Sequence, residues 1–246
     1  MKITKLTYPP ERLAALPPAQ LSALLLLGHF LTEANWLQKL LWLGTQDSTG
    51  HKAEQDARLA FNLMVTNLFA AKIHEGWNRL RTGPLSKTID DLPLSEGTRL
   101  NREQLASRLD ADSILHKIRV AHASHYPPVL SLDGLPNIDQ SDLALYLTPH
   151  SGDTLSVMST LSAAAAMNEI GGDPVLEVSL GRILDEVLSV ARIYSDYLQG
   201  ALIALMDAAG LDDPKEETFD DPAAPKFEDL RLRYFSVVPD TPPEIQ

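Results

Sequence analysis

The stretch KIRVAHASHYPP, residues 117–128, places one arginine and two histidines within seven residues. Arg119, His122 and His125 are residue types suited to cleavage of a phosphodiester. An imidazole moves protons near neutral pH, and a guanidinium stabilises the negative charge that develops on the phosphate. These three residues are therefore our candidate catalytic group. A structural interpretation competes with it, because histidine cations near a helix C-terminus are favourable without any chemistry.

The geometry of the helix that carries this group decides whether its members can meet. On an unbroken helix Arg119 and His122 are neighbours, whereas Arg119 and His125 lie about 240° apart around the axis. Tyr126 is followed by two prolines, which cannot continue the hydrogen-bond ladder, so we expect the helix to end near His125. The arginine and His125 converge if this helix kinks or unwinds before His125.

The spacing of Arg119, five residues and His125 resembles the Arg-x(4–6)-His motif of the HEPN superfamily, which lies late in an all-helical domain. The resemblance covers the predicted bundle from Ala19 to Pro127. It implies a metal-independent ribonuclease of a bacterial toxin-antitoxin or defence system, without a cofactor, or an inactive relative. It also implies a homodimer in which Arg119 and His125 of both copies line one groove. The family usually has a polar residue after the arginine, where this chain has Val120.

Polar side chains embedded in apolar helical segments form a second group of candidates. Lys72 and Glu75 continue, by steps of three and four residues, an apolar stripe that begins with Phe61, Val65 and Leu68. Burying such groups without partners is costly, so we expect them to pair with one another or to reach a cleft or the end of the bundle. The candidate binding residues are Glu33, Asn35, Lys72 and Glu75.

Composition limits the classes of partner. The 33 acidic and 21 basic residues give a formal net charge of -12, which opposes broad adhesion to nucleic acid or to anionic membrane. Any contact with RNA must then be local. The absence of cysteine excludes disulfides and thiolate metal sites, and we expect no metal centre. The N-terminus lacks the features of a secretory signal, so the cytoplasm is the expected location.

The elements that must position these residues are mainly helical. Apolar periodicity, caps and prolines predict helices over residues 19–44, 52–81, 101–109, 110–125, 160–170 and 174–209, with a loop over 84–100. Asp110 is the expected cap of the fourth helix. In the last helix apolar residues from Leu180 to Leu205 recur with a period of 3.5, which requires a long partner helix. That partner is either another helix of this chain or a second copy.

The remaining segments are not predicted to be helical. Alternating apolar residues on both sides of PHSGD predict a β-hairpin at about 142–158. Residues 210–246 are acidic and rich in proline, which predicts a largely unfolded tail. The predicted fold is therefore mainly α: an antiparallel helical bundle that forms a single domain over 1–209, with a small hairpin insertion and a poorly structured acidic C-terminal tail.

Two classes of function remain open. The clustering of Arg119, His122 and His125 near Lys72 and Glu75 favours an RNA-cleaving enzyme. The negative charge and the apolar residue after the arginine favour a non-catalytic helical module that binds a partner protein.

Overall fold

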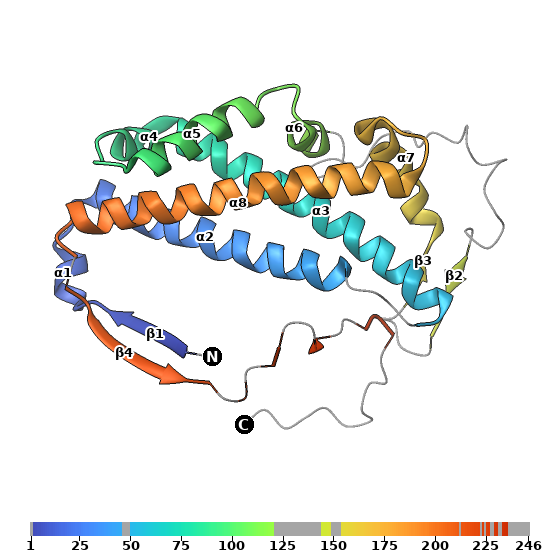
Figure 1. Ribbon diagram of the computed structural model, residues 1–246, viewed down its shortest axis with the longest axis horizontal. Helices are drawn as coiled ribbons and strands as arrows, with labels where there is room; N and C mark the ends of the chain where they lie inside the picture. Colours follow the sequence, from blue (N-terminus) through green and yellow to red (C-terminus); the bar gives the residue numbers. More distant parts are fainter. Residues whose placement is uncertain are drawn as a thin grey trace.

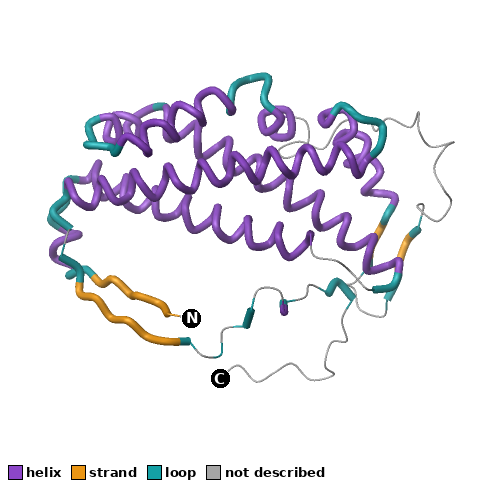
Figure 2. Tube along the Cα trace, viewed as in Figure 1, coloured by secondary structure: helices purple, strands orange, loops and turns teal. Residues whose placement is uncertain are grey.

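The computed structural model describes residues 2–45, 50–120, 144–148, 154–211 and 213–221, together with 223, 225–226, 229–230 and 233–235. Over these residues the chain is mainly helical, with two small antiparallel sheets (Figure 1). Figure 2 shows how the long helices lie side by side while both sheets lie at the margin of the bundle. The predicted class, a mainly α bundle with a small hairpin, is confirmed.

The helices follow one another in a simple order along the chain. Their bounds are α1 (Pro10–Ala14), α2 (Pro18–Thr45), α3 (Lys52–Arg81), α4 (Gly83–Asp90), α5 (Glu96–Arg108), α6 (Ile114–Ile118), α7 (Met158–Gly171) and α8 (Leu176–Ala208). One sheet pairs β1 (Lys2–Thr7) with β4 (Lys215–Asp220), and the other pairs β2 (Leu145–Tyr146) with β3 (Leu155–Ser156).

The core is organised along α8, which packs against α2, α5 and α7 and more lightly against α3 and α6. Figure 1 shows α2 on one side of α8 and the pair α4 and α5 on the other. The predicted seam of α8 forms much of the interior. Its fully buried members are Val187, Ala191, Leu198, Ala201 and Leu205. The long partner helix that the seam requires is thus present in the same chain.

The buried face of α3 differs from the predicted one. Val65 of the predicted stripe is buried, but Leu68 is substantially exposed, and Phe69, Ile73 and Trp77 point into the core instead. The reason is that α3 contacts other helices on several sides, so the sequence pattern does not single out one inward stripe. Lys72 and Glu75 consequently lie at the edge of the core rather than within it.

Several helix boundaries differ from those expected. The predicted loop over 84–100 contains α4, which begins at Gly83 with a positive φ of 75°, and the first turn of α5. The cap of α6 is Ser113, whose hydroxyl accepts a hydrogen bond from the His116 amide at 3.2 Å. The predicted cap Asp110 instead accepts from the Asp112 amide, in the turn before α6. Short polar segments fold into helix here because each has a neighbouring surface to cover.

The hairpin is confirmed, with strands of two residues each. Part of the predicted unfolded tail, by contrast, forms β4, which pairs with the N-terminal strand. The register places Lys2 opposite Asp220 and Lys5 opposite Glu217, so opposite charges face each other across the two strands. The acidic composition that suggested an unfolded tail supports pairing here, because the complementary strand is basic.

A short segment near the C-terminus also docks on the bundle. The buried carboxylate of Glu54, in the first turn of α3, accepts hydrogen bonds from the amides of Tyr234 and Phe235 at 3.2 and 3.1 Å. The two rings pack in a small apolar cluster that includes Leu155 and Val157 of the hairpin region. The hairpin and the docked segment therefore support each other at one end of α3.

Two leucines on α2 test this assignment of the core. Leu27 is fully buried, whereas Leu25 is 64% exposed. We expect Leu27→Ala to lower the free energy of unfolding by about 2–5 kcal/mol, because the variant leaves a cavity. The matched control Leu25→Ala should change it by less than about 0.5 kcal/mol. Urea denaturation measures both, and equal losses would contradict the arrangement of α2.

Candidate functional site

Arg119 lies at the end of α6, on the surface where α6 meets α3. Its side chain is 34% exposed, and its Nη2 lies 3.5 Å from the Glu75 carboxylate of α3. His122 and His125 belong to the segment 121–143, which lies outside the described residues. The structure thus brings together two of the predicted residues, the arginine and one of the binding candidates, and the convergence of the two histidines on them stays a prediction.

Glu75 is shared between two arginines. Its other carboxylate oxygen lies 3.5 Å from Nε of Arg79, one turn further along α3. Both distances are long for an ion pair, and all three side chains are partly exposed, so each contact contributes no more than about 1 kcal/mol. Arg119 is therefore held loosely, and among the residues that the structure describes Glu75 is the one carboxylate paired with its guanidinium.

Two histidines that were not among the predicted residues lie beside this arginine. Nε2 of the buried His74 is 3.1 Å from Nδ1 of the half-buried His116, a hydrogen-bond distance. His116 precedes Arg119 by one helical turn, and His74 precedes Glu75 directly. The position of His116 three residues before Arg119 is a signal that could have indicated it. The contact with His74, on another helix, has no local signature.

The hydrogen bonds of His74 continue along α3. Its Nδ1 lies 3.1 Å from Nδ2 of Asn78, and Oδ1 of Asn78 accepts from Nε of Arg81 at 3.1 Å. Both ring nitrogens of this buried histidine therefore have a partner, as buried polar groups require. The result is a polar chain from Arg81 through Asn78 and His74 to His116.

The surroundings keep His74 uncharged. Burial, the main cause, together with the nearby His116, Arg119 and Arg81, lowers the pKa of His74 from 6.5 to about 4, while Glu75 acts in the opposite direction. A neutral imidazole can donate one hydrogen bond and accept one, and it has both partners here. At neutral pH His74 therefore adds no charge to this site.

Glu33 and Lys72 form a separate pair. Lys72 Nζ lies 2.7 Å from Glu33 Oε1, so these two candidates pair with each other, which is one of the alternatives that the sequence left open. The pair borders a narrow crevice between α2, α3 and α8 whose other side includes Phe30 and Tyr194. The free volume is about 10 Å³, room for about one water molecule. This pair thus belongs to the packing of three helices rather than to a ligand pocket.

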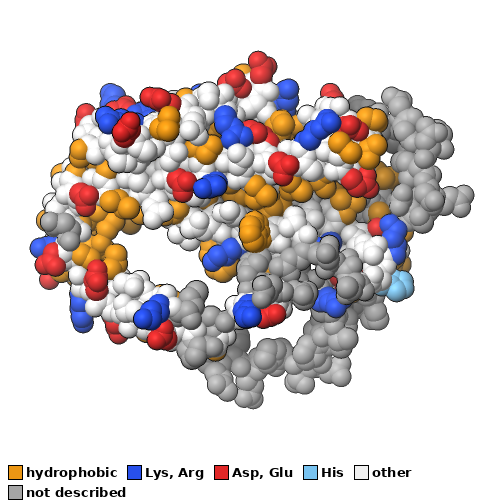
Figure 3. Space-filling model, in the orientation of Figure 1, with side chains coloured by type: hydrophobic (Ala, Val, Ile, Leu, Met, Phe, Trp, Pro, Cys, Tyr) orange, Lys and Arg blue, Asp and Glu red, His pale blue; other side chains and the backbone are white. Residues whose placement is uncertain are grey.

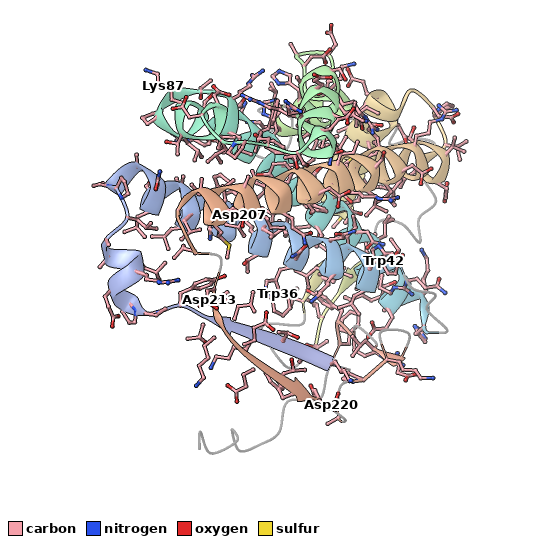
Figure 4. The ribbon with its side chains drawn as sticks, turned by 60° about the vertical axis from the view of Figure 1, so that its left-hand side comes forward. Trp36, Trp42, Lys87, Asp207, Asp213 and Asp220 are labelled. Atoms are coloured by element: carbon pink, nitrogen blue, oxygen red, sulfur yellow. The ribbon has the colours of Figure 1, made fainter. Side chains whose placement is uncertain are left out.

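Asn35 lies apart from both the Glu33–Lys72 pair and the contact between Glu75 and Arg119. Because Asn35 and Glu33 are two residues apart, their side chains leave α2 on nearly opposite sides. Asn35 lines a shallow surface groove of about 300 Å³ with Gln38, Lys39 and Trp42, all from α2. Figure 4 shows Trp36 and Trp42 on α2, with Trp36 on the side toward the ribbon of β1 and β4. The four predicted binding residues therefore occupy three distinct places.

The fold and this geometry define a helical-bundle protein with an Arg–His site at the junction of α3 and α6. Within the described residues, no group of three or more histidine, aspartate or glutamate side chains is placed to hold a metal ion, and no helix is long and apolar enough to cross a membrane. A scan against protein-family models and searches of curated proteins and of solved structures find no match. The functional argument therefore depends on the chemistry of the site.

The depressed pKa of His74 predicts how stability changes with pH. The unfolded chain binds a proton at this histidine near pH 6.5, whereas the folded chain binds it near pH 4. Protonation therefore favours unfolding, and the free energy of unfolding should fall by up to about 3 kcal/mol from this group as pH decreases from 6.5 to 4. An NMR titration of the ring should give a pKa near 4. A His74 ring that titrates near 6.5 would contradict the site as described.

Proposed function

We propose that this protein is a HEPN-like, metal-independent ribonuclease of a toxin or defence system, in which Arg119 binds the scissile phosphate. The observation that carries the proposal is a part-exposed, loosely paired arginine beside a hydrogen-bonded pair of histidines. His125, with His122, supplies the proton transfers, as the motif implies. Glu75 positions the guanidinium until RNA displaces it.

The electrostatics of the site suit an anionic substrate. Arg79 and Arg119 share one carboxylate, so these three side chains carry a net positive charge within a protein of net charge -12. Local positive charge is what a polyanion requires when the whole surface does not attract it. Arginine also offers several donors in one plane, which matches the oxygens of a phosphate.

A homodimer is part of the proposal. Attack by a ribose 2′-hydroxyl benefits from a base on one side of the phosphorus and an acid on the other. Two copies related by a two-fold axis supply both from one His125 each, and they double the arginine charge at the shared groove. The cytoplasm, where RNA is abundant, is the proposed location.

A second candidate is a non-catalytic module that binds a partner protein. It is favoured by the exposed tryptophans of α2: Trp36 is 62% exposed and Trp42 is 53% exposed, next to the groove that includes Asn35. Tryptophan is enriched at binding hot spots of protein interfaces. In this case α2, rather than the junction of α3 and α6, carries the function.

An RNA cleavage assay distinguishes the two candidates. The purified full chain should cleave RNA at the same rate with and without a metal chelator. Arg119→Ala should lower the rate at least roughly a hundredfold, because stabilisation of the developing negative charge is lost. His125→Ala should abolish cleavage. Sedimentation under the assay conditions should show a dimer.

The matched control is Arg12→Ala, which removes the same charge from α1, far from α6 (Figure 1). Its cleavage rate should equal that of the wild type. Cleavage that survives Arg119→Ala, that stops in the chelator or that comes from a monomer would contradict the proposed mechanism. Absence of any cleavage by the wild type would leave the binding module as the better account.

A further inference from the structure

The direction of each hydrogen bond in the polar chain can be derived from Arg81. A guanidinium can donate hydrogen bonds but cannot accept them. Nε of Arg81 lies 3.1 Å from Asn78 Oδ1, so this contact requires the carbonyl oxygen of Asn78 to face the arginine. This contact therefore determines which end of the Asn78 side-chain amide is the oxygen and which is the nitrogen. The shape of the amide alone does not distinguish the two.

The orientation of Asn78 determines the tautomer of His74. The Asn78 Nδ2 group now faces Nδ1 of His74 at 3.1 Å, and an NH₂ group can only donate. Nδ1 of His74 is therefore the acceptor, and the ring proton of the neutral histidine resides on Nε2. The depressed pKa of this ring is consistent with its neutral form.

The same reasoning extends to His116. Nε2–H of His74 donates to Nδ1 of His116 at 3.1 Å, and the two rings are tilted by 52° with centroids 5.0 Å apart. Nδ1 of His116 is thus an acceptor, so the proton of its neutral ring resides on Nε2. Since Nδ1 is occupied, Nε2–H is the group that this half-buried ring can offer to a ligand.

The geometry points to a phosphate-binding site with two donors, the Nε2–H of His116 and the guanidinium of Arg119. The two residues are three apart at the end of α6, which places them on neighbouring positions of one helical face. Arg119 supplies charge, and His116 supplies a directed hydrogen bond. His74, Asn78 and Arg81 are positioning residues, since they fix the proton of His116 without contact with the ligand.

The polar chain also fixes the role of Nδ1 of His116, which accepts a hydrogen bond from Nε2–H of His74. An imidazolium would carry N–H at Nδ1, directed at the Nε2–H of His74. Relief of this conflict requires His74 to move its proton to Nδ1 and Asn78 to reverse its amide, which would turn the NH₂ group toward the Arg81 guanidinium. His116 is therefore a donor to an oxyanion rather than a general base. Its use in RNA cleavage rests on the proposed function, in which other groups transfer the protons.

The first experiment observes the tautomers directly in the wild-type chain. Nitrogen-15 NMR at neutral pH should show Nδ1 unprotonated and Nε2 protonated in both His74 and His116. Asn78→Asp should reverse the chain, because the introduced carboxylate accepts from both Arg81 and Nδ1–H of His74. His116 should then carry a proton at Nδ1. A wild-type His116 protonated at Nδ1, or tautomers unchanged in Asn78→Asp, would overturn the inference.

The second experiment measures inorganic phosphate binding to the full chain, followed by the His116 Nε2 resonance or by calorimetry. Arg119→Ala and His116→Ala should each weaken binding by roughly tenfold or more. His116→Gln should retain most of the affinity, because its amide offers a similar donor. Arg12→Ala is the control and should bind as the wild type does. Equal phosphate affinity in the wild type and in Arg119→Ala, or no phosphate binding by the wild type, would overturn the site.

These outcomes are separable from those of the cleavage assay. Phosphate binding and the stated tautomers without RNA cleavage would refute the ribonuclease and leave the anion site standing. RNA cleavage by a chain whose His116 is protonated at Nδ1 would refute this inference and leave the ribonuclease standing.

Discussion

The buried face of α8 is the constraint on which the rest of the structure depends. Its apolar residues, including Val187, Leu198 and Leu205, are fully removed from solvent by α2, α5 and α7. Full burial of one such side chain contributes about 1.5–3 kcal/mol, so the face fixes the positions of the helices that cover it. Arg108 of α5 forms an ion pair with Glu186 of α8 at the margin of this face. α3 and α6 pack beside the helices positioned in this way, and Arg119 meets Glu75 at the junction between α3 and α6.

Within the described part of the core, some buried polar atoms have a hydrogen-bond partner and others have none. The hydroxyls of Tyr194 and Tyr197 and the indole nitrogen of Trp77 are buried without a hydrogen-bond partner. Gly76 allows this close packing, because a Cβ there would lie 2.0 Å from the Tyr194 hydroxyl. Burial raises the pKa of Tyr194, so the ring stays neutral. His74, in contrast, has a partner for each ring nitrogen. The buried carboxylate of Glu54 likewise has partners, so hydrogen bonding of buried polar groups is not confined to the Arg–His site.

The surface around α2 has a different character. Figure 3 shows an opening between the bundle and the ribbon of β1 and β4, bordered in part by apolar side chains. The ribbon pairs the N-terminal strand with a strand that follows α8, with Lys2 opposite Asp220, and it leaves Trp36 exposed. The strands are held by backbone pairing and by cross-strand charges rather than by a core, because nearly all of their residues are exposed.

Local patterns were sufficient for the fold class and for most helices. The bounds Lys52–Arg81 of α3 follow from its apolar content and from the Gly83 and Pro84 that follow, and α7 ends before Gly172, whose φ is 72°. Each of these signals involves residues a few positions apart, which interact in any chain that contains them. The pairing of Glu33 with Lys72 was anticipated in part, since buried charges need partners, but the sequence did not select the partner.

Only the tertiary structure decided which distant residues meet. β1 pairs with β4 across almost the whole chain, and His74 meets His116 across 42 residues. Neither contact has a periodic signature, because it depends on how whole helices and strands are placed rather than on any local spacing. The burial that lowers the pKa of His74 arises in the same way. The sequence by itself determined a helical bundle and an arginine at the end of a helix, and packing decided which histidines lie beside that arginine, because burial and hydrogen bonding are properties of assembled surfaces.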